Sequence, residues 1–363
     1  MREVSMSRMT ALLAVTLLLI AIVSVTVEGM HASASEGISS IHVVVSSSSL
    51  LWIVKGVGGD LVSVVNIVPP GTDPHTYEPP PSQLISMLKR ADVVFITGPT
   101  HLPVELRIRE LAREGAIKAV IVDYEDYVRH GLKILPNPRT GLPNPHGYLF
   151  SLTGLCVVAR TVSDVLSAID PTHATYFKAR ADALVQNLMS ELSALRETVP
   201  HGLRVGLAGP PLQYVTEELG LNVTFMLLPD VESEPSENDV TALINAVKAH
   251  EIDAFLISDM VAAKNPKVIT LVQGLGIPAV LVPIAKYSST PHVISPALTW
   301  ELRSLTQPRS SGSDERISSS SGDEWELLHE FAVWLAACEA VLILVLITIL
   351  TRYRRVIMNA TLK

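Results

Sequence analysis

Short apolar runs rich in branched residues alternate with helix-length spacers through the middle of the chain. Four occur in the first half of this region and four in the second, at residues 41–46, 61–68, 91–97, 118–123, 203–208, 222–228, 253–258 and 279–284. Continuous apolar runs of this length are typical of parallel strands that are buried on both faces and joined by helical crossovers. The pattern predicts an α/β fold with two lobes of about four βα units each.

The stretch between the two sets of strands has a helical period instead. Asp170 is a suitable N-cap, Pro171 suits a first helical turn, and nothing breaks the pattern before Pro200. Leucines recur at helical spacing, at Leu184, Leu188, Leu192 and Leu195. One long helix is therefore predicted to join the lobes, and such a rod permits only modest lobe closure.

The first apolar segment of the chain, residues 10–27, carries no charge and follows Arg2 and Arg8. Small residues at Ala32 and Ala34 come next, which completes the pattern of a secretory signal peptide over residues 1–35. An uncleaved membrane anchor is the alternative, because the run is about long enough to span a bilayer. No cysteine follows the run, which disfavours a lipid-anchored start.

A second apolar segment, residues 331–351, is followed at once by three arginines. Twenty residues of helix span roughly 30 Å, the thickness of the hydrocarbon core, and a basic flank favours the cytoplasmic side. We expect a transmembrane helix here, with residues 352–363 as a cytoplasmic tail. Residues 307–330 are Ser-rich and charged without apolar period, which indicates a flexible stalk.

The remaining domain boundaries follow from these segments. Residues 36–165 are predicted to form the N-terminal lobe, 166–200 the linking helix region, and 201–306 the C-terminal lobe. The formal net charge of −8 and the lack of a basic stripe argue against a nucleic acid partner. The two cysteines, Cys156 and Cys338, lie in the body and in the predicted anchor, so they cannot pair.

A proline-rich loop, "VPPGTDPHTYEPPPSQL" at residues 68–84, surrounds His75 directly after a predicted strand. Open α/β sheets bind ligands at this carboxyl edge, and prolines fix φ so that the loop loses little entropy on ordering. His146 stands in a similar setting, "LPNPHGYLF". Preorganised neutral imidazoles are common metal ligands. The alternative interpretation is an exposed polyproline segment with two surface histidines.

The same loop carries a family resemblance. "GTDPHTYEPPPSQL" followed by "LKRADVVFITG" resembles the signature of the zinc and manganese substrate-binding proteins of ATP-binding cassette importers. The similarity covers about residues 41–290 and continues through "NPHGY", "YVTEELGLN" and "EPSENDVTALINAVKAHEIDAFL", with Gln83 in place of an Asp. The resemblance implies two α/β lobes bridged by one helix, with a metal ion held between them.

Only half of the family's ligand set carries over to this sequence. His75 and His146 match the first two ligands. With Tyr214 aligned, the third ligand position falls on Gly209, and the fourth falls among residues 282–286, where no acid exists. Two imidazoles leave zinc short of its usual three or four protein ligands. Lys286 must also point away from a bound cation, because its ammonium would repel the ion.

Other acids are candidates to complete the site. Asp259 lies just past the third strand of the second lobe, at the edge that faces the cleft, and is the predicted third ligand. Asp230, Glu232 and His101 are further candidates, because each follows a predicted strand. The predicted metal ligands are therefore His75, His146 and Asp259.

Two functions are compatible with these features. The first is a membrane-anchored extracellular subunit that binds zinc or manganese and delivers it to an ATP-binding cassette permease. The second is a degenerate family member that binds another small ligand or a protein in the same cleft. No H-E-x-x-H, G-x-S-x-G or Walker motif is present, so an enzyme is not expected. No His-rich loop precedes His146, which leaves the choice between zinc and manganese open.

Overall fold

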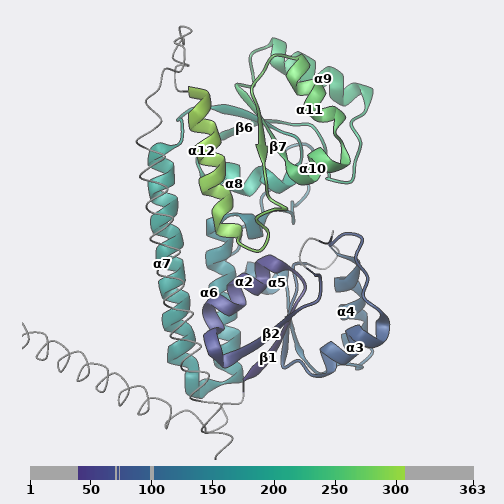
Figure 1. Ribbon diagram of the computed structural model, residues 1–363, viewed down its shortest axis with the longest axis vertical. Helices are drawn as coiled ribbons and strands as arrows, with labels where there is room; N and C mark the ends of the chain where they lie inside the picture. The colour runs from purple at the N-terminus through teal and green to yellow at the C-terminus, as the bar shows by residue number, and fades with distance from the viewer. Residues whose placement is uncertain (1–39, 70–71, 73, 99–101, 307–363) are drawn as a thin grey trace, which may run out of the picture. The chain divides into compact units, whose positions relative to one another are not determined.

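The computed structural model describes residues 40–69, 72, 74–98 and 102–306, which all belong to one compact unit. The predicted signal peptide at 1–35 lies outside the described residues. The stalk, the transmembrane helix and the cytoplasmic tail predicted after residue 306 also lie outside them. The described part comprises two α/β lobes (Figure 1).

The first lobe is built on a sheet of four parallel strands in the order β2-β1-β3-β4. Its strands are β1 (Ile41–Val45), β2 (Val62–Asn66), β3 (Val93–Phe95) and β4 (Val120–Val122). Its helices are α2 (Ser48–Gly58), α3 (Pro81–Lys89), α4 (Pro103–Arg113) and α5 (Tyr124–Arg129), with short 3₁₀ turns η1 (Gly59–Leu61) and η2 (Tyr148–Phe150).

The second lobe repeats this topology, with strand order β6-β5-β7-β8 and all pairs parallel. Its strands are β5 (Arg204–Leu207), β6 (Asn222–Met226), β7 (Ala254–Ser258) and β8 (Ala279–Val282). Its helices are α8 (Gln213–Glu218), α9 (Glu237–Lys248), α10 (Asp259–Lys264), α11 (Lys267–Gly274) and α12 (Ile294–Thr306), with 3₁₀ turns η4 (Pro210–Leu212) and η5 (Pro291–Val293). All eight strands fall on the apolar runs identified in the sequence, so this prediction is confirmed.

The connection between the sheets contains α6 (Leu152–Ile169), the 3₁₀ turn η3 (Pro171–His173) and α7 (Ala174–Thr198). The predicted long helix is α7, which has 25 residues and buries one face that includes Phe177 and Leu188. The sequence pattern did not predict α6 as a separate helix. Figure 1 shows α6 and α7 side by side along the two lobes, and the two helices pack against each other extensively.

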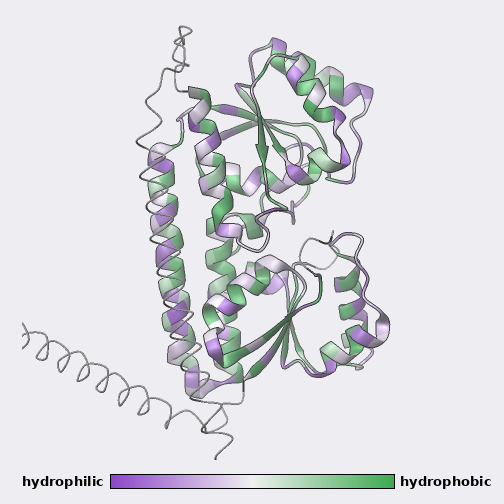
Figure 2. Ribbon diagram, viewed as in Figure 1, coloured by the Kyte–Doolittle hydropathy of each residue, from purple (hydrophilic) through white to green (hydrophobic). Residues whose placement is uncertain are grey.

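Among the described residues, α6 is the helix that is long and apolar enough to cross a membrane. More than half of its apolar window, 56%, is buried inside the protein. Figure 2 shows its hydrophobic positions in green beside the more mixed surface of α7. We therefore interpret α6 as a core helix of the body, because a helix that packs on protein is not available to lipid.

The largest hydrophobic cluster continues from one lobe into the other. It joins residues of the first sheet, such as Val43, through Leu155 of α6 and Leu188 of α7 to Val205 and Leu256 of the second sheet. Two smaller clusters lie within the separate lobes. Since close-packed interiors resist deformation, this continuous core limits how far the lobes can move.

A loop of the first lobe, residues 131–147, also crosses to the second lobe. The Arg139 guanidinium donates to Leu227 O and pairs with Asp239, and Asn137 Nδ2 donates to Pro229 O at 3.1 Å. These bonds tie the loop to the segment that follows β6. We call residues 131–147 the crossing loop.

Candidate metal-binding site

A cavity of about 390 Å³ lies at the carboxyl edges of the two sheets. Its lining comes from both lobes, and both predicted histidine ligands and the predicted acid contribute to it. The lining residues include Ser47, Ser48, Ser49, His75, Thr97, His146, Gly147, Tyr148, Pro211, Val231, Asp259 and Lys264. The structure thus places His75, His146 and Asp259 around one cavity, although they are far apart in sequence.

His75 lies in a turn between β2 and α3, as the sequence pattern predicted. The helix after it begins at Pro81, a position where the missing N–H of proline costs nothing. The preceding backbone is tied to the sheet, because Ile67 N–H donates to Val45 O at 2.9 Å. The loop that carries the imidazole is therefore held at both of its ends.

His146 belongs to the crossing loop and is positioned mainly by the second lobe. Its backbone N–H donates to Asn144 Oδ1 at 2.9 Å. The amide of Asn144 in turn donates to Pro210 O at 3.1 Å and to Gln213 Oε1 at 2.9 Å. Tyr214 OH donates to Asn144 O at 2.6 Å, so the turn before His146 has partners on several sides. His146 thus belongs to the first lobe by sequence but is held by the second.

The environment of His146 favours its neutral form. Burial lowers the pKa of His146 below its usual value, and nearby His75 lowers it further, while Asp230 acts in the opposite direction. Both histidines also line the same cavity. A neutral imidazole is the form that ligates a metal ion, so His146 is ready to bind at neutral pH.

This lowered pKa predicts a pH dependence of stability in the metal-free protein. The unfolded state binds more protons than the folded state once the pH falls below about 6.5, the usual pKa of histidine. The free energy of unfolding should therefore fall as the pH drops through this window and be fully regained above it. Urea titrations between pH 7.5 and 5 measure the effect. His146→Gln should show a weaker decline, and an equal decline in both proteins would contradict the assignment.

Asp259 is the first residue of α10 and anchors the loop that follows β8. Its carboxylate accepts the backbone N–H of Ala285 at 2.9 Å and that of Lys286 at 3.2 Å. The side chain of Lys286 is exposed and its Nζ lies 5.2 Å from the centre of the Tyr287 ring. Lys286 is not among the residues that line the cavity.

The other acidic candidates lie at the same edge. Asp230 Oδ2 is 3.6 Å from His146 Nε2, and Glu232 pairs with Lys264. His101 lies outside the described residues. Within the described ranges, no three His, Cys, Asp or Glu side chains are close enough to hold a metal ion together. The described structure therefore places two imidazoles near several acidic side chains.

Several groups that line or support the cavity were not predicted from the sequence. Ser47 caps α2, and its hydroxyl accepts the N–H of Leu50. The run "SSSS" after the first strand was a signal for this cap, because serine is a preferred N-cap residue. No comparable signal marked Lys264. Tyr148 is also part of the lining, and its OH donates to Thr97 O at 2.6 Å.

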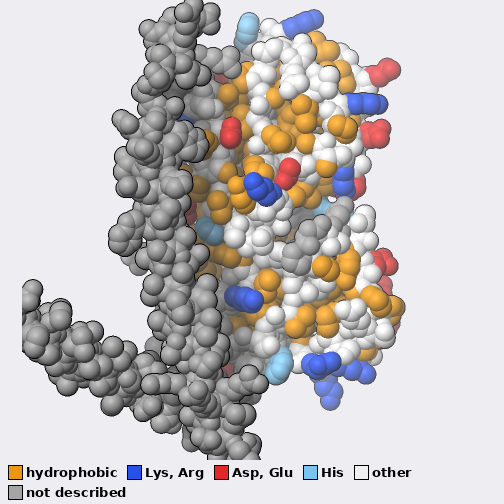
Figure 3. Space-filling view, in the orientation of Figure 1, with side chains coloured by type: hydrophobic (Ala, Val, Ile, Leu, Met, Phe, Trp, Pro, Cys, Tyr) orange, Lys and Arg blue, Asp and Glu red, His pale blue; other side chains and the backbone are white. Residues whose placement is uncertain are grey.

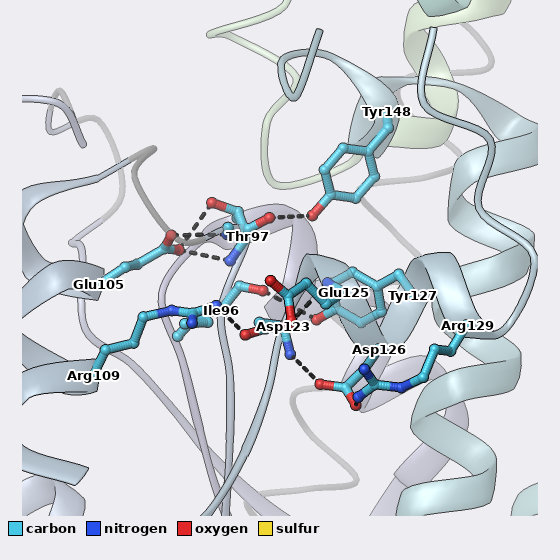
Figure 4. Close-up of polar contacts among 11 residues, drawn as sticks. Ile96, Thr97, Glu105, Arg109, Asp123, Glu125, Asp126, Tyr127, Arg129 and Tyr148 are labelled. Carbon is cyan, nitrogen blue, oxygen red and sulfur yellow. Dashed lines mark hydrogen bonds and ion pairs between the residues drawn. The ribbon is translucent and has the colours of Figure 1, made fainter. Parts of the chain in front are cut away.

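Beneath the cavity, a buried carboxylate organises the ends of two strands. Glu105 accepts hydrogen bonds from the Ser46 hydroxyl and from Gly98 N–H. It also accepts hydrogen bonds from the N–H and hydroxyl of Thr97 (Figure 4). Burial raises the pKa of Glu105, and these hydrogen bonds counteract the shift. Through Thr97 and Tyr148 the network reaches the segment that directly follows His146.

On the face of the body shown in Figure 3, Lys and Arg side chains are scattered among other side-chain types, and no basic stripe crosses this face.

Comparison with known proteins identifies the family of this chain. The sequence profile of the family described as "Zinc-uptake complex component A periplasmic" matches residues 43–291, well over half of the chain. The chain therefore belongs to this family, whose members are uptake components and not enzymes.

Individual relatives are distant but cover most of the body. A metal ABC transporter substrate-binding lipoprotein of Lactococcus lactis is 26% identical over 250 residues, which are 66% of this chain and 77% of that protein. The manganese ABC transporter substrate-binding lipoprotein PsaA of Streptococcus pneumoniae is 21% identical over 247 residues, 66% of this chain and 78% of that protein. FpvC of Pseudomonas aeruginosa, solved in complex with Ni²⁺, aligns with a TM-score of 0.61 and 20% identity, covering 76% of this chain and 100% of FpvC. The structural likeness supports the two-lobe fold.

Proposed function

We propose that this protein captures a divalent metal ion, zinc or manganese, outside the cell and delivers it to the permease of an ATP-binding cassette importer. The observation that carries the proposal is the convergence of His75 and His146 on one cavity between two lobes. Asp259 lines the same cavity and is the acid that the sequence predicted as a third ligand. The family and the names of the relatives support this cargo class.

The proposal includes the membrane anchor predicted over residues 331–351, with the two-lobe body outside the cell. The relatives are named as lipoproteins. In this chain, however, the cysteines are Cys156, which is buried in α6, and Cys338, within the predicted anchor. A protein tether of this kind keeps the body at high effective concentration near a permease.

Metal titration tests the proposal. Calorimetry on the full-length protein, purified in detergent and stripped of metal, should show binding of zinc or manganese. His75→Ala and His146→Ala should each weaken affinity by at least tenfold, about 1.4 kcal/mol, because a site with few protein ligands cannot compensate for a lost imidazole. His201→Ala, which alters an exposed histidine outside the cavity, is the matched control. Unchanged affinity in both ligand variants would refute the assigned site.

A second function is a scaffold that has exchanged its cargo. The cavity of about 390 Å³ is large for a single ion and falls in the range of small-molecule pockets. It also lacks three clustered ligand side chains among the described residues. If the unmutated protein binds neither ion, this alternative replaces the first, and the cavity becomes a site for a small organic ligand or a protein segment.

A further inference from the structure

The crossing loop and the segment after β6 bring one acid directly to the imidazole of His146. Asp230 Oδ2 lies 3.6 Å from His146 Nε2. This separation exceeds the roughly 2.7–3.2 Å of a normal hydrogen bond. Zinc–nitrogen and zinc–oxygen bonds of roughly 2.0–2.2 Å at a tetrahedral angle place the two ligand atoms roughly 3.4 Å apart. The observed separation therefore matches two atoms that share a metal ion better than it matches a direct hydrogen bond.

Asp230 is held in this position from both sides by contacts with described residues. Its Oδ1 accepts Glu232 N–H at 3.1 Å, which leaves Oδ2 facing His146. The preceding residue, Pro229, is fixed because its carbonyl accepts the Asn137 amide at 3.1 Å. Asn137 belongs to the crossing loop, which also carries His146. The loop that provides the imidazole thus also positions the acid opposite it.

The carboxylate of Asp259 is engaged by backbone N–H groups more fully than that of Asp230. Both of its oxygens accept backbone N–H groups of the loop after β8, so its carboxylate already stabilises that loop. The exposed fraction of the Asp230 side chain is 44%, which leaves it accessible to an arriving ion. Residue 209, where the resemblance places a ligand, is a glycine, and a side chain there would meet Val261 Cγ2 at 3.4 Å from its Cβ.

We propose that Asp230 is a metal ligand of this protein and binds the ion together with His146. The inference rests on the function proposed above and assigns its acidic ligand to the second lobe, at the end of β6. An Asp ligand adds a negative charge beside the neutral imidazole, which a divalent cation prefers to an all-neutral set. Oxygen and imidazole ligands together suit both zinc and manganese.

The test compares three full-length variants in detergent, each stripped of metal. Asp230→Asn keeps the size of the side chain but removes its charge, and it should weaken zinc affinity at least tenfold in calorimetry. Glu234→Gln removes an exposed acid from the same segment and should bind zinc as the unmutated protein does. Asp259→Asn tests the acid that the sequence favoured. Thermal melts of the metal-free proteins should show that Asp230→Asn folds normally.

Cobalt provides a readout that a purely structural role would not change. Co²⁺ bound to the unmutated protein should give visible absorption bands that shift or weaken in Asp230→Asn and persist in Glu234→Gln. Unchanged zinc affinity and an unchanged cobalt spectrum in Asp230→Asn would overturn the inference while leaving the proposed function intact. Absence of zinc, manganese and cobalt binding by the unmutated protein would overturn both.

Discussion

Replacing Glu105 with alanine is expected to lower the free energy of unfolding by roughly 3–5 kcal/mol, because it strands several buried donors at once. The carboxylate accepts four hydrogen bonds, from Ser46, from the N–H and hydroxyl of Thr97, and from Gly98 N–H. The side chain itself is fully buried, so water cannot replace the lost acceptor without opening the lobe. This loss is a large share of the roughly 5–15 kcal/mol that stabilises a typical domain.

Urea titration of the two-lobe body, residues 36–306, followed by circular dichroism, measures this effect. Glu105→Gln should be less damaging, because the amide keeps one acceptor oxygen but presents an N–H₂ group to one of the donors. Glu110→Ala on the same helix removes an exposed acid that pairs with Arg107 at 2.9 Å, and it should cost less than about 1 kcal/mol. If Glu105→Ala and Glu110→Ala cost the same, the network does not stabilise the lobe as argued.

Gly147→Ala should destabilise the body by roughly 2–5 kcal/mol and also weaken metal binding. Gly147 has φ of +93°, and a Cβ at this position would lie 2.2 Å from Pro211 O. Pro211 belongs to the second lobe, and its backbone cannot move aside as a flexible side chain would. The added methyl group therefore forces the crossing loop away from the second lobe, and His146, the neighbouring residue, moves with it.

Gly141→Ala separates the two causes of this effect. Gly141 also has a positive φ, +70°, in the same crossing loop, but nothing lies within 4 Å of a Cβ built there. Its substitution should cost only the backbone strain, about 1–2 kcal/mol, and leave zinc affinity unchanged. Urea titration and zinc calorimetry on both variants measure the difference. Equal losses at the two positions would show that contact with Pro211 does not position His146.

Much of the fold was predictable because it depends on local pattern. Each of the eight strands is an apolar run between turn residues, and each lies where its sequence predicted. The helix α7 follows an N-cap residue, a proline and leucines at helical spacing. The place of His75 was equally local, because a strand followed by a proline-rich loop defines the carboxyl edge of the sheet. These features depend on neighbours within a few turns of the chain.

The arrangement of the site depended instead on contacts between distant segments. The sequence predicted that His146 and an acid of the second lobe approach each other, and it named Asp259. Asp259 lines the same cavity as His146, and Asp230 Oδ2 lies 3.6 Å from His146 Nε2. The deciding contacts join Asn137 to Pro229 and Asn144 to Pro210, pairs separated by 92 and 66 positions. No periodicity encodes such pairs, since they depend on how two finished lobes pack.

The sequence by itself therefore determined the fold class, the order of the strands along the chain and the residue types that can hold a metal ion. Only the tertiary structure decided which of these side chains meet. A helical or strand period places a side chain on one face of its own element, and that information is local. Which loop of one lobe reaches which loop of the other follows from the continuous core and the crossing loop, because close packing there admits few alternative arrangements.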